Sequence, residues 1–281
     1  MRIDLHAHST ASDGTDEPAV VMRRARDAGL DVVALTDHDT VAGHGAAATA
    51  LPAGLTLVPG AELSCEWEGT SLHLLAYLFA PDHPELAGEL DLLKDDRDRR
   101  AREMVVRLRS LGVDVAYDRV LALAAGGAVG RPHVARAMVE AGVVGSVAEA
   151  FTDEWIGSEG RAYVDKYALD PCRAVALVAA AGGVTVFAHP GAAKRGRVLP
   201  PEAVDALAAA GLTGIEVDHP DHDAATRVAL RERAGSLGLL VTGSSDDHGS
   251  ITGHRLGCET TDPEVFAALC ERATGARPVT A

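Results

Sequence analysis

The feature of the sequence that most constrains its fold is the alternation of short apolar runs with longer segments of helical pattern. Segment 18–28, for example, has a proline in its first turn and Gly29 directly after its last residue, which are signals for the start and end of a helix. Such alternation predicts repeated βα units, an α/β fold and a largely parallel sheet. The apolar runs predict strands at residues 3–5, 31–35, 55–58, 72–78, 184–188, 214–217 and 239–242.

The pattern changes between residues 84 and 167. Helical patterns dominate there, Gly126-Gly127 and the glycines of 157–160 interrupt them, and no strongly apolar strand is evident. We therefore expect a small helical insertion, residues 84–167, in a larger domain made of residues 1–83 and 168–281. With 47% apolar residues, the chain can bury a core of this size.

The charge balance and the cysteines exclude several classes of protein. Lys and Arg number 26 against 41 Asp and Glu, a net charge of −15, which disfavours a broad nucleic-acid-coating surface because such binding depends on Lys and Arg. The four cysteines are scattered without a C-x-x-C pair, so neither a disulfide framework nor a thiolate zinc site is indicated. No leader or long apolar span is evident in the sequence, and we expect a cytoplasmic protein.

Histidines and carboxylates gather at the ends of the predicted strands. They include His6, His8, Asp13, Asp37, His38, Glu62, His189, His219, Asp246 and His248, with His73 inside the fourth strand. The carboxyl ends of parallel strands meet at one mouth of a βα barrel, and these side chains are good ligands for zinc, manganese and iron. Each motif alone is weak evidence, but burying so many ionisable groups without a cation is costly. The sequence therefore predicts a multinuclear metal site, with Glu62 as the bridging carboxylate.

The order of these motifs resembles the polymerase and histidinol phosphatase (PHP) superfamily. The match runs from His-Ala-His at 6–8 through Thr-Asp-His-Asp-Thr at 36–40 and Ala-His-Pro-Gly at 188–191 to Ser-Asp-Asp-His at 245–248. It implies a distorted seven-stranded βα barrel that holds two to three divalent ions, with Mn²⁺, Fe²⁺ and Zn²⁺ all open.

The resemblance also implies a ligand set for each ion. One ion would be held by His6, His8, Glu62 and Asp246, the second by Glu62, His73 and His189, and the third by Asp13, His38 and His248. Asp247 competes with Asp246 for its role, and Asp13 stands where the family often has histidine.

The predicted insertion narrows the resemblance. The stretch GGAVGRPHVARAMVEAG at 126–142 and GRAYV at 160–164 are similar to nucleoside 3′,5′-bisphosphate phosphatases and related 5′-to-3′ exoribonucleases. This implies removal of the 3′-phosphate by a hydroxide that bridges two ions, to give a nucleoside 5′-monophosphate, and trimming of short 5′-phosphorylated RNA. The expected partner is a small phosphorylated nucleotide or short RNA, without a membrane or an obligate protein partner.

A bisphosphate needs an anchor for the phosphate that is not cleaved, and arginine can hold phosphate oxygens with two parallel donors. The candidates are Arg131, His133, Arg97, Arg100 and Arg161. By spacing alone, however, the arginine-rich run 97–102 also fits a solvated helix face balanced by nearby acids.

Three further residues are candidates for catalysis. His219, His222 or the third ion could protonate the leaving 3′-oxygen, and the sequence leaves this choice open. Asp37 is interpreted as a carboxylate that orients a metal ligand.

Two other functions remain open at this point. One is a phosphatase for histidinol phosphate or another small phosphomonoester, which would use the same ions with different anchors. The other is a non-catalytic, metal-stabilised interaction module.

Overall fold

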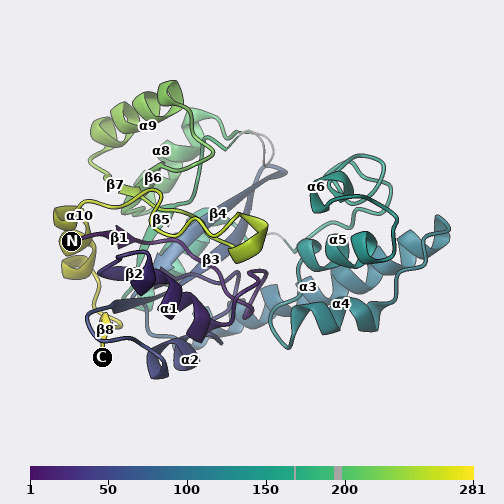
Figure 1. Cartoon of the computed structure of the whole chain (residues 1–281). Helices are drawn as coiled ribbons and strands as arrows, with labels where there is room; N and C mark the ends of the chain where they lie inside the picture. Colours follow the sequence, from purple (N-terminus) through teal and green to yellow (C-terminus); the bar gives the residue numbers. More distant parts are fainter. Residues whose placement is uncertain (168, 193–197) are drawn as a thin grey trace.

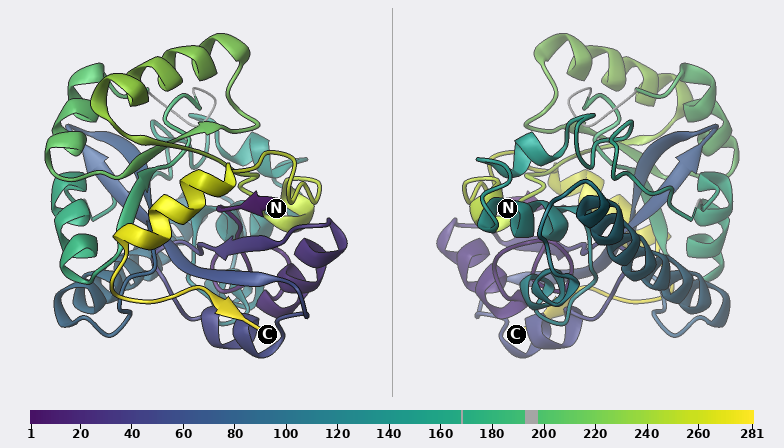
Figure 2. Two further views of the ribbon diagram at one scale, coloured as in Figure 1. Left: turned by 90° about the vertical axis from the view of Figure 1, so that its left-hand side faces the viewer. Right: turned by 90° about the vertical axis from the view of Figure 1, so that its right-hand side faces the viewer.

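The structure is a computed structural model that describes residues 1–167, 169–192 and 198–281. Seven strands form a nearly closed barrel in the order β1-β2-β3-β4-β5-β6-β7 (Figures 1 and 2). They are β1 Ile3–Asp4, β2 Val32–Leu35, β3 Thr56–Trp67, β4 Thr70–Tyr77, β5 Val184–Phe187, β6 Gly214–Asp218 and β7 Leu240–Gly243. A bridge between Ala7 and Asp247 joins the segments that follow β1 and β7. The predicted α/β barrel is confirmed.

The sheet is largely parallel, as expected, but β4 is an exception. Parallel pairing joins β1 to β2, β2 to β3, β5 to β6 and β6 to β7, but β4 runs antiparallel to both β3 and β5. The reason is a two-residue turn, Glu68 and Gly69, with φ of 46° and 76°. Positive φ at both central residues is typical of the tight turns that join antiparallel strands.

This hairpin also lengthens β3 well beyond the predicted 55–58. Glu62 therefore lies within β3, where it pairs with Leu75, and does not follow the strand as expected. A short strand that was not predicted, β8 Val279–Thr280, pairs with β3 at the opposite end.

Helices α1, α2 and α7–α10 surround the barrel, whereas α4–α6 stand apart from it with the second half of α3 (Figure 1). The described helices are α1 Pro18–Asp27, α2 His44–Thr49, α3 Pro84–Ser110, α4 Tyr117–Ala124, α5 Arg131–Glu140, α6 Val147–Ala150, α7 Pro171–Ala180, α8 Pro201–Ala209, α9 Ala224–Leu237 and α10 Pro263–Arg272, with a short 3₁₀ helix, η2, at Gly249–Ile251. None of these helices is long and apolar enough to cross a membrane.

Helix α3 belongs to two hydrophobic cores. Leu86, Leu90 and Leu93 pack with β3, β4 and α7, whereas Met104 and Leu108 pack with α4 and α5. Helix α3 thus connects the barrel core to the core of a second unit. We call this second unit, made of the second half of α3 with α4, α5 and α6, the helical unit. The expected boundary at 83/84 stays a prediction, and residue 168, where the larger domain was expected to resume, lies outside the described residues.

The helical unit also contacts the barrel through the loop before α5. The backbone N–H of Ala128 donates to the carbonyl of Ala11 at 2.8 Å. A Cβ atom added at Gly127 would lie 2.1 Å from the Thr10 carbonyl oxygen. Glycine at 127 therefore permits the backbones to approach this closely.

We predict that Gly127→Ala lowers the free energy of unfolding by about 1–3 kcal/mol, because the added methyl group overlaps rigid backbone atoms. Gly88→Ala is the control, since Gly88 is exposed in α3 with nothing within 4 Å of the added atom. The control should gain about 0.5–1 kcal/mol. Urea unfolding measures both, and equal stabilities of the two variants would contradict the close approach.

Candidate metal centre

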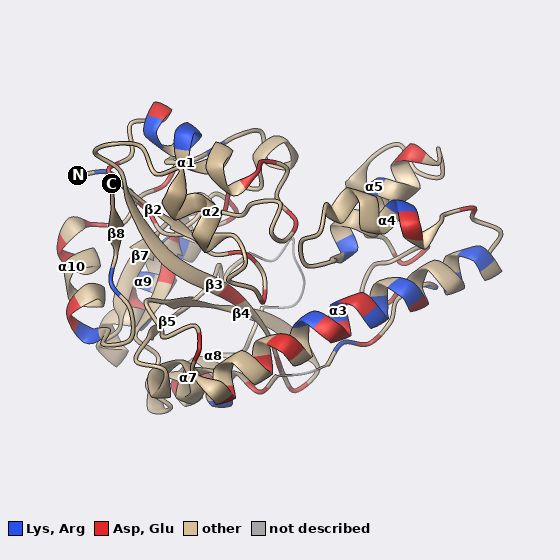
Figure 3. Ribbon diagram, turned by 90° about the horizontal axis from the view of Figure 1, so that it is seen from below, with Lys and Arg blue, Asp and Glu red and all other residues tan. Residues whose placement is uncertain are grey.

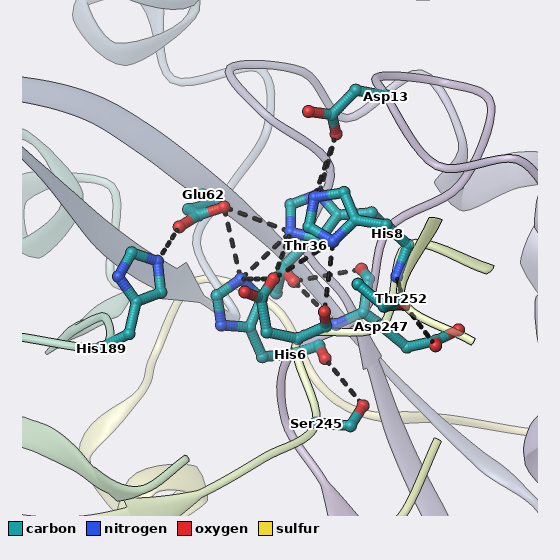
Figure 4. Close-up of polar contacts among 12 residues, drawn as sticks. His6, His8, Asp13, Thr36, Glu62, His189, Ser245, Asp247 and Thr252 are labelled. Atoms are coloured by element: carbon teal, nitrogen blue, oxygen red, sulfur yellow. Dashed lines mark hydrogen bonds and ion pairs between the residues drawn. The ribbon is translucent and has the colours of Figure 1, made fainter. Parts of the chain in front are cut away.

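The nine side chains expected as metal ligands come together at one end of the barrel. Figure 4 labels His6, His8, Asp13, Glu62 and His189 among them. His6 and His8 follow β1, Glu62 lies in β3, and Asp246 follows β7. These four side chains are at most 1% exposed. The remaining five surround them: Asp13, His38, His73, His189 and His248.

Glu62 is at the centre of the cluster. Its Oε2 atom lies 3.2–3.3 Å from nitrogens of His6, His8 and His38. Its Oε1 atom lies 2.8 Å from His73 Nδ1 and 2.9 Å from His189 Nε2. Burial opposes ionisation, but the surrounding imidazoles, His38 foremost, hold the pKa of the Glu62 carboxyl well below its usual range. The geometry fits the bridging role expected of Glu62.

The first predicted ligand set converges on one point. The Nε2 atoms of His6 and His8 are 3.1 Å apart, and each lies 3.3 Å from Asp246 Oδ1. One ligand atom from each of these three residues and Glu62 falls within 4.8 Å of the others. Two imidazole nitrogens that face each other and two carboxylates can share a cation between them, so the donor set fits a divalent ion.

The third predicted set also converges. Asp13 lies 3.3 Å from His248 Nε2 and 3.7 Å from His38 Nε2, and His8 joins these three residues in one group of close ligand atoms. His38 connects the groups, because its Nδ1 faces Glu62 while its Nε2 faces Asp13. Burial lowers the pKa of His38 to about 3, which keeps the imidazole neutral and able to bind metal.

The second predicted set is organised around a single oxygen. His73 and His189 both contact Glu62 Oε1, with their ring centroids 5.5 Å apart. His38 also lies close enough to share an ion with Glu62 and His73. Which of these histidines bind the second ion stays a prediction.

The structure separates Asp246 from its neighbour Asp247. Asp247 accepts hydrogen bonds from the Thr252 hydroxyl at 2.9 Å and from the backbone N–H groups of Gly249 and Arg255 at 3.1 and 2.7 Å. Its carboxylate organises the loop after β7, whereas that of Asp246 faces His6 and His8. The geometry favours Asp246 as the ligand.

Asp37 acts on the loop that carries Asp13. Its carboxylate accepts hydrogen bonds from the Ser9 N–H at 2.8 Å, the Ser9 hydroxyl at 2.7 Å and the Ser12 hydroxyl at 2.7 Å. The Ser12 hydroxyl also lies 3.5 Å from His8 Nδ1. Asp37 is thus placed to orient ligands through the serines of this loop and not by direct contact with them.

The two histidines proposed as acids differ in their surroundings. His222 donates from Nδ1 to the Val217 carbonyl at 2.8 Å and accepts at Nε2 from the Gly191 N–H at 3.0 Å, so backbone groups occupy both nitrogens. His219 accepts at Nδ1 from the Asp221 N–H at 3.0 Å. Its proton therefore sits on Nε2, 3.4 Å from Asp246 Oδ2.

The basic run in α3 divides between two faces of the helix. Arg99 and Arg102 are exposed and form ion pairs with Asp96 and Asp98, as the alternating charges along α3 illustrate (Figure 3). Arg97 instead donates to Asp39 at 2.6 Å and to the Ser64 hydroxyl at 2.7 Å. The interpretation of this run as a solvated helix face balanced by acids thus holds for Arg99 and Arg102 but not for Arg97.

Arg100 and Arg131 form a pair of guanidinium groups that are bound by backbone carbonyls and not by carboxylates. Arg100 donates to the Val164 carbonyl at 3.1 Å and Arg131 to that of Ile156 at 3.4 Å. Both guanidinium groups lie over the Tyr163 ring, 5.9 and 5.7 Å from its centroid. Among the described residues neither has a carboxylate oxygen within 4.0 Å. Burial and the charge of Arg131 lower the pKa of Arg100 to about 10.

The other two candidate anchors differ in burial. His133 is 1% exposed and accepts at Nδ1 from the Gly130 N–H at 3.0 Å, which leaves Nε2 as its donor. Burial lowers its pKa. Arg161 is exposed.

Glu216, in β6, was not predicted as a site residue. It is fully buried and lies 3.1 Å from His6 Nδ1 through its Oε1 atom. Although burial opposes it, the charge of His6 foremost lowers the pKa of the Glu216 carboxyl to about 2. In the sequence, Glu216 lies within an apolar run that predicts a strand. Its only signal is the charge itself, because a carboxylate buried in such a strand needs a partner.

We predict that binding of a divalent cation releases protons and tightens as the pH rises. Burial disfavours charge on His8, but the Asp246 and Glu62 carboxylates raise its pKa to about 10 in the metal-free protein. His8 is then protonated at neutral pH and must lose its proton to bind metal. Each released proton makes affinity rise by about tenfold per pH unit below that pKa.

Calorimetric titration with Mn²⁺ in two buffers of different ionisation enthalpy measures this release. His8→Gln is the control and should release fewer protons. An affinity independent of pH would contradict the prediction.

Comparison with known proteins identifies the family of this chain. The model of the family described as PHP domain matches residues 4–78. A 5′-3′ exoribonuclease of Haemophilus influenzae is 39% identical over 190 residues, which are 67% of this chain and 69% of that protein. A 3′,5′-nucleoside bisphosphate phosphatase of Chromobacterium violaceum is 32% identical over 255 residues, 90% of this chain and 89% of the relative.

A solved structure agrees over nearly the whole chain. It is that of a Bifidobacterium adolescentis protein described as a metal-dependent phosphoesterase, 35% identical, with a TM-score of 0.89. The superposition covers 97% of this chain and 96% of that one. The resemblance inferred from the motifs is confirmed, and the chain belongs to the PHP family of metal-dependent phosphoesterases.

Proposed function

We propose that this protein removes the 3′-phosphate from nucleoside 3′,5′-bisphosphates and leaves nucleoside 5′-monophosphates. The observation that carries the proposal is the pair Arg100 and Arg131, two half-buried guanidinium groups that have no carboxylate oxygen within 4.0 Å among the described residues. One phosphate would bind at the metal cluster and the other at the arginines. The names of two relatives, a bisphosphate phosphatase and an exoribonuclease, support the same substrate class.

Arg97 interacts electrostatically with both the arginine pair and the candidate metal cluster. Its positive charge contributes to the low pKa of Arg100 and Arg131, and the Asp13 and Glu62 carboxylates help to raise its own pKa. These mutual effects require proximity. We therefore propose that one small substrate with two phosphates contacts both groups.

The arginine pair suits a terminal phosphate. Holding two like charges together in a half-buried place is unfavourable, and a dianion relieves that repulsion. Each guanidinium group also offers several donors in a plane, which phosphate oxygens can accept in pairs. The Nε2 donor of His133, whose Nδ1 accepts from the backbone, would add a further bond.

When bound, divalent ions supply a hydroxide nucleophile near neutral pH and neutralise the oxygens of the phosphoryl group. Glu62 and Asp246, with the imidazoles of His6 and His8, would hold ions in place. His219 carries its proton on Nε2 and faces Asp246, so we assign to it protonation of the leaving 3′-oxygen. His222 lacks a free nitrogen for this role, since backbone groups occupy both.

We extend the proposal to short RNA with a 5′-phosphate. The terminal phosphate would bind at the arginine pair while the first phosphodiester reaches the metal cluster. A net charge of −15 favours short substrates, because a long footprint depends on many Lys and Arg contacts. The exoribonuclease among the relatives supports this extension.

The alternatives differ in what they require of the arginines. A phosphatase for histidinol phosphate or another small monophosphate needs no second anion site, so Arg100 and Arg131 would have no purpose in it. Membership of a family of metal-dependent hydrolases argues against the non-catalytic module.

We predict that Arg131→Ala lowers kcat/KM for adenosine 3′,5′-bisphosphate by about 10–100-fold, as expected for loss of a charged hydrogen bond worth about 1.5–3 kcal/mol. Hydrolysis of adenosine 3′-monophosphate, which lacks the second phosphate, should change little. The measurement is release of inorganic phosphate by Mn²⁺-supplemented protein.

The matched control is Arg109→Ala, which removes an exposed arginine in the last turn of α3 and should leave both activities unchanged. Equal losses of Arg131→Ala on the two substrates would contradict the assignment of the arginine pair. Rapid hydrolysis of histidinol phosphate without hydrolysis of the bisphosphate would replace it with the small-monophosphate alternative.

A further inference from the structure

We propose that Glu216 is a positioning residue that fixes metal ligands of two different loops at once. It lies in β6, between the loops that carry His6 and His189, and its side chain is fully buried. The inference deepens the proposed function and rests on its metal ligands, but it does not depend on the substrate.

The first action of Glu216 is on the tautomer of His6. Its Oε1 atom lies 3.1 Å from His6 Nδ1, so this nitrogen carries a proton and donates it. The lone pair of a neutral His6 is then on Nε2, which faces Glu62 Oε2 and Asp246 Oδ1 at 3.3 Å each. A carboxylate behind a ligand histidine both orients the ring and raises its basicity.

The second action of Glu216 is on the backbone of His189. The His189 N–H donates to Glu216 Oε2 at 2.6 Å. His189 has a φ of 31°, a conformation that residues other than glycine rarely adopt and that surrounding bonds must maintain. In this conformation its Nε2 atom lies 2.9 Å from Glu62 Oε1.

A third donor completes the environment of Glu216. The hydroxyl of Ser244, directly after β7, donates to Oε1. Both carboxylate oxygens therefore act as acceptors, for groups that follow β1, β5 and β7. A glutamine side chain has the same size but only one acceptor oxygen, so its NH₂ group would face either the His6 and Ser244 donors or the His189 N–H.

The experiment compares Glu216→Gln with Glu89→Gln in the full chain. Glu89 is also buried, at 2% exposure, and accepts from the Tyr167 hydroxyl at 2.7 Å and from Arg173 at 3.1 Å, none of which is a candidate ligand. Mn²⁺ affinity is measured by competition with a chelator, and thermal unfolding of the metal-free proteins shows whether each variant is folded.

We expect Glu216→Gln to weaken Mn²⁺ binding by about 10–100-fold, the usual effect of removing a carboxylate behind a ligand histidine, while Glu89→Gln binds as the wild type does. If Glu216→Gln does not fold, Glu216→Asp takes its place. The shorter side chain keeps both acceptor oxygens but withdraws them from His6, and we expect a smaller loss in the same direction.

Wild-type Mn²⁺ affinity in the folded Glu216 variant would overturn the inference, as would an equal loss in Glu89→Gln. Neither result would affect the substrate assignment, because that assignment is tested by phosphate release. Conversely, absence of bisphosphate hydrolysis in the wild-type protein would overturn the proposed function and leave the Mn²⁺ comparison valid.

Discussion

The site depends on one buried carboxylate, Glu62, that is surrounded by imidazoles. Five histidines place a nitrogen within 3.3 Å of its two oxygens. Such a concentration of ionisable groups is unfavourable in a protein interior unless opposite charges compensate. Divalent cations would supply that compensation, because they replace the protons shared among the imidazoles and bind the carboxylates. The same groups that are unfavourable to bury together therefore make this end of the barrel a candidate cation site.

The position of Glu62 follows from the irregularity of the barrel. A parallel sheet would place ligands only at strand ends, but the β3–β4 hairpin continues past the other strands and carries Glu62 and His73 on neighbouring strands. His73 pairs with Ser64, two residues from Glu62 on the same strand, so the two side chains are on the same face of the sheet. Antiparallel pairing at β4 thus lets the middle of a strand contribute ligands beside those of the loops.

The sequence predicted the parts of the structure that local patterns specify. The seven strands were predicted from apolar runs. The family and the nine clustered side chains were predicted from short motifs and their order along the sequence. Glu216 could not be predicted in this way, because its importance comes from contacts with His6 and His189, which are distant in sequence. The direction of β4 was also missed, since the two-residue turn at Glu68 and Gly69 carries little sequence signal beyond one glycine.

The helical unit is joined to the barrel by helix α3, and an ion pair and a close backbone contact add to this connection. Arg97 is bound to Asp39 and Ser64 of the barrel, and it lies in the same helix as Arg100. Asp39 directly follows the candidate ligand His38, and Ser64 lies two residues after Glu62 in β3. The arginine pair that we propose as the anchor for a second phosphate is thus connected to the candidate metal cluster through short elements. A fixed separation of the two groups would suit the substrate that we propose, because a flexible ligand would lose more conformational entropy on binding both groups.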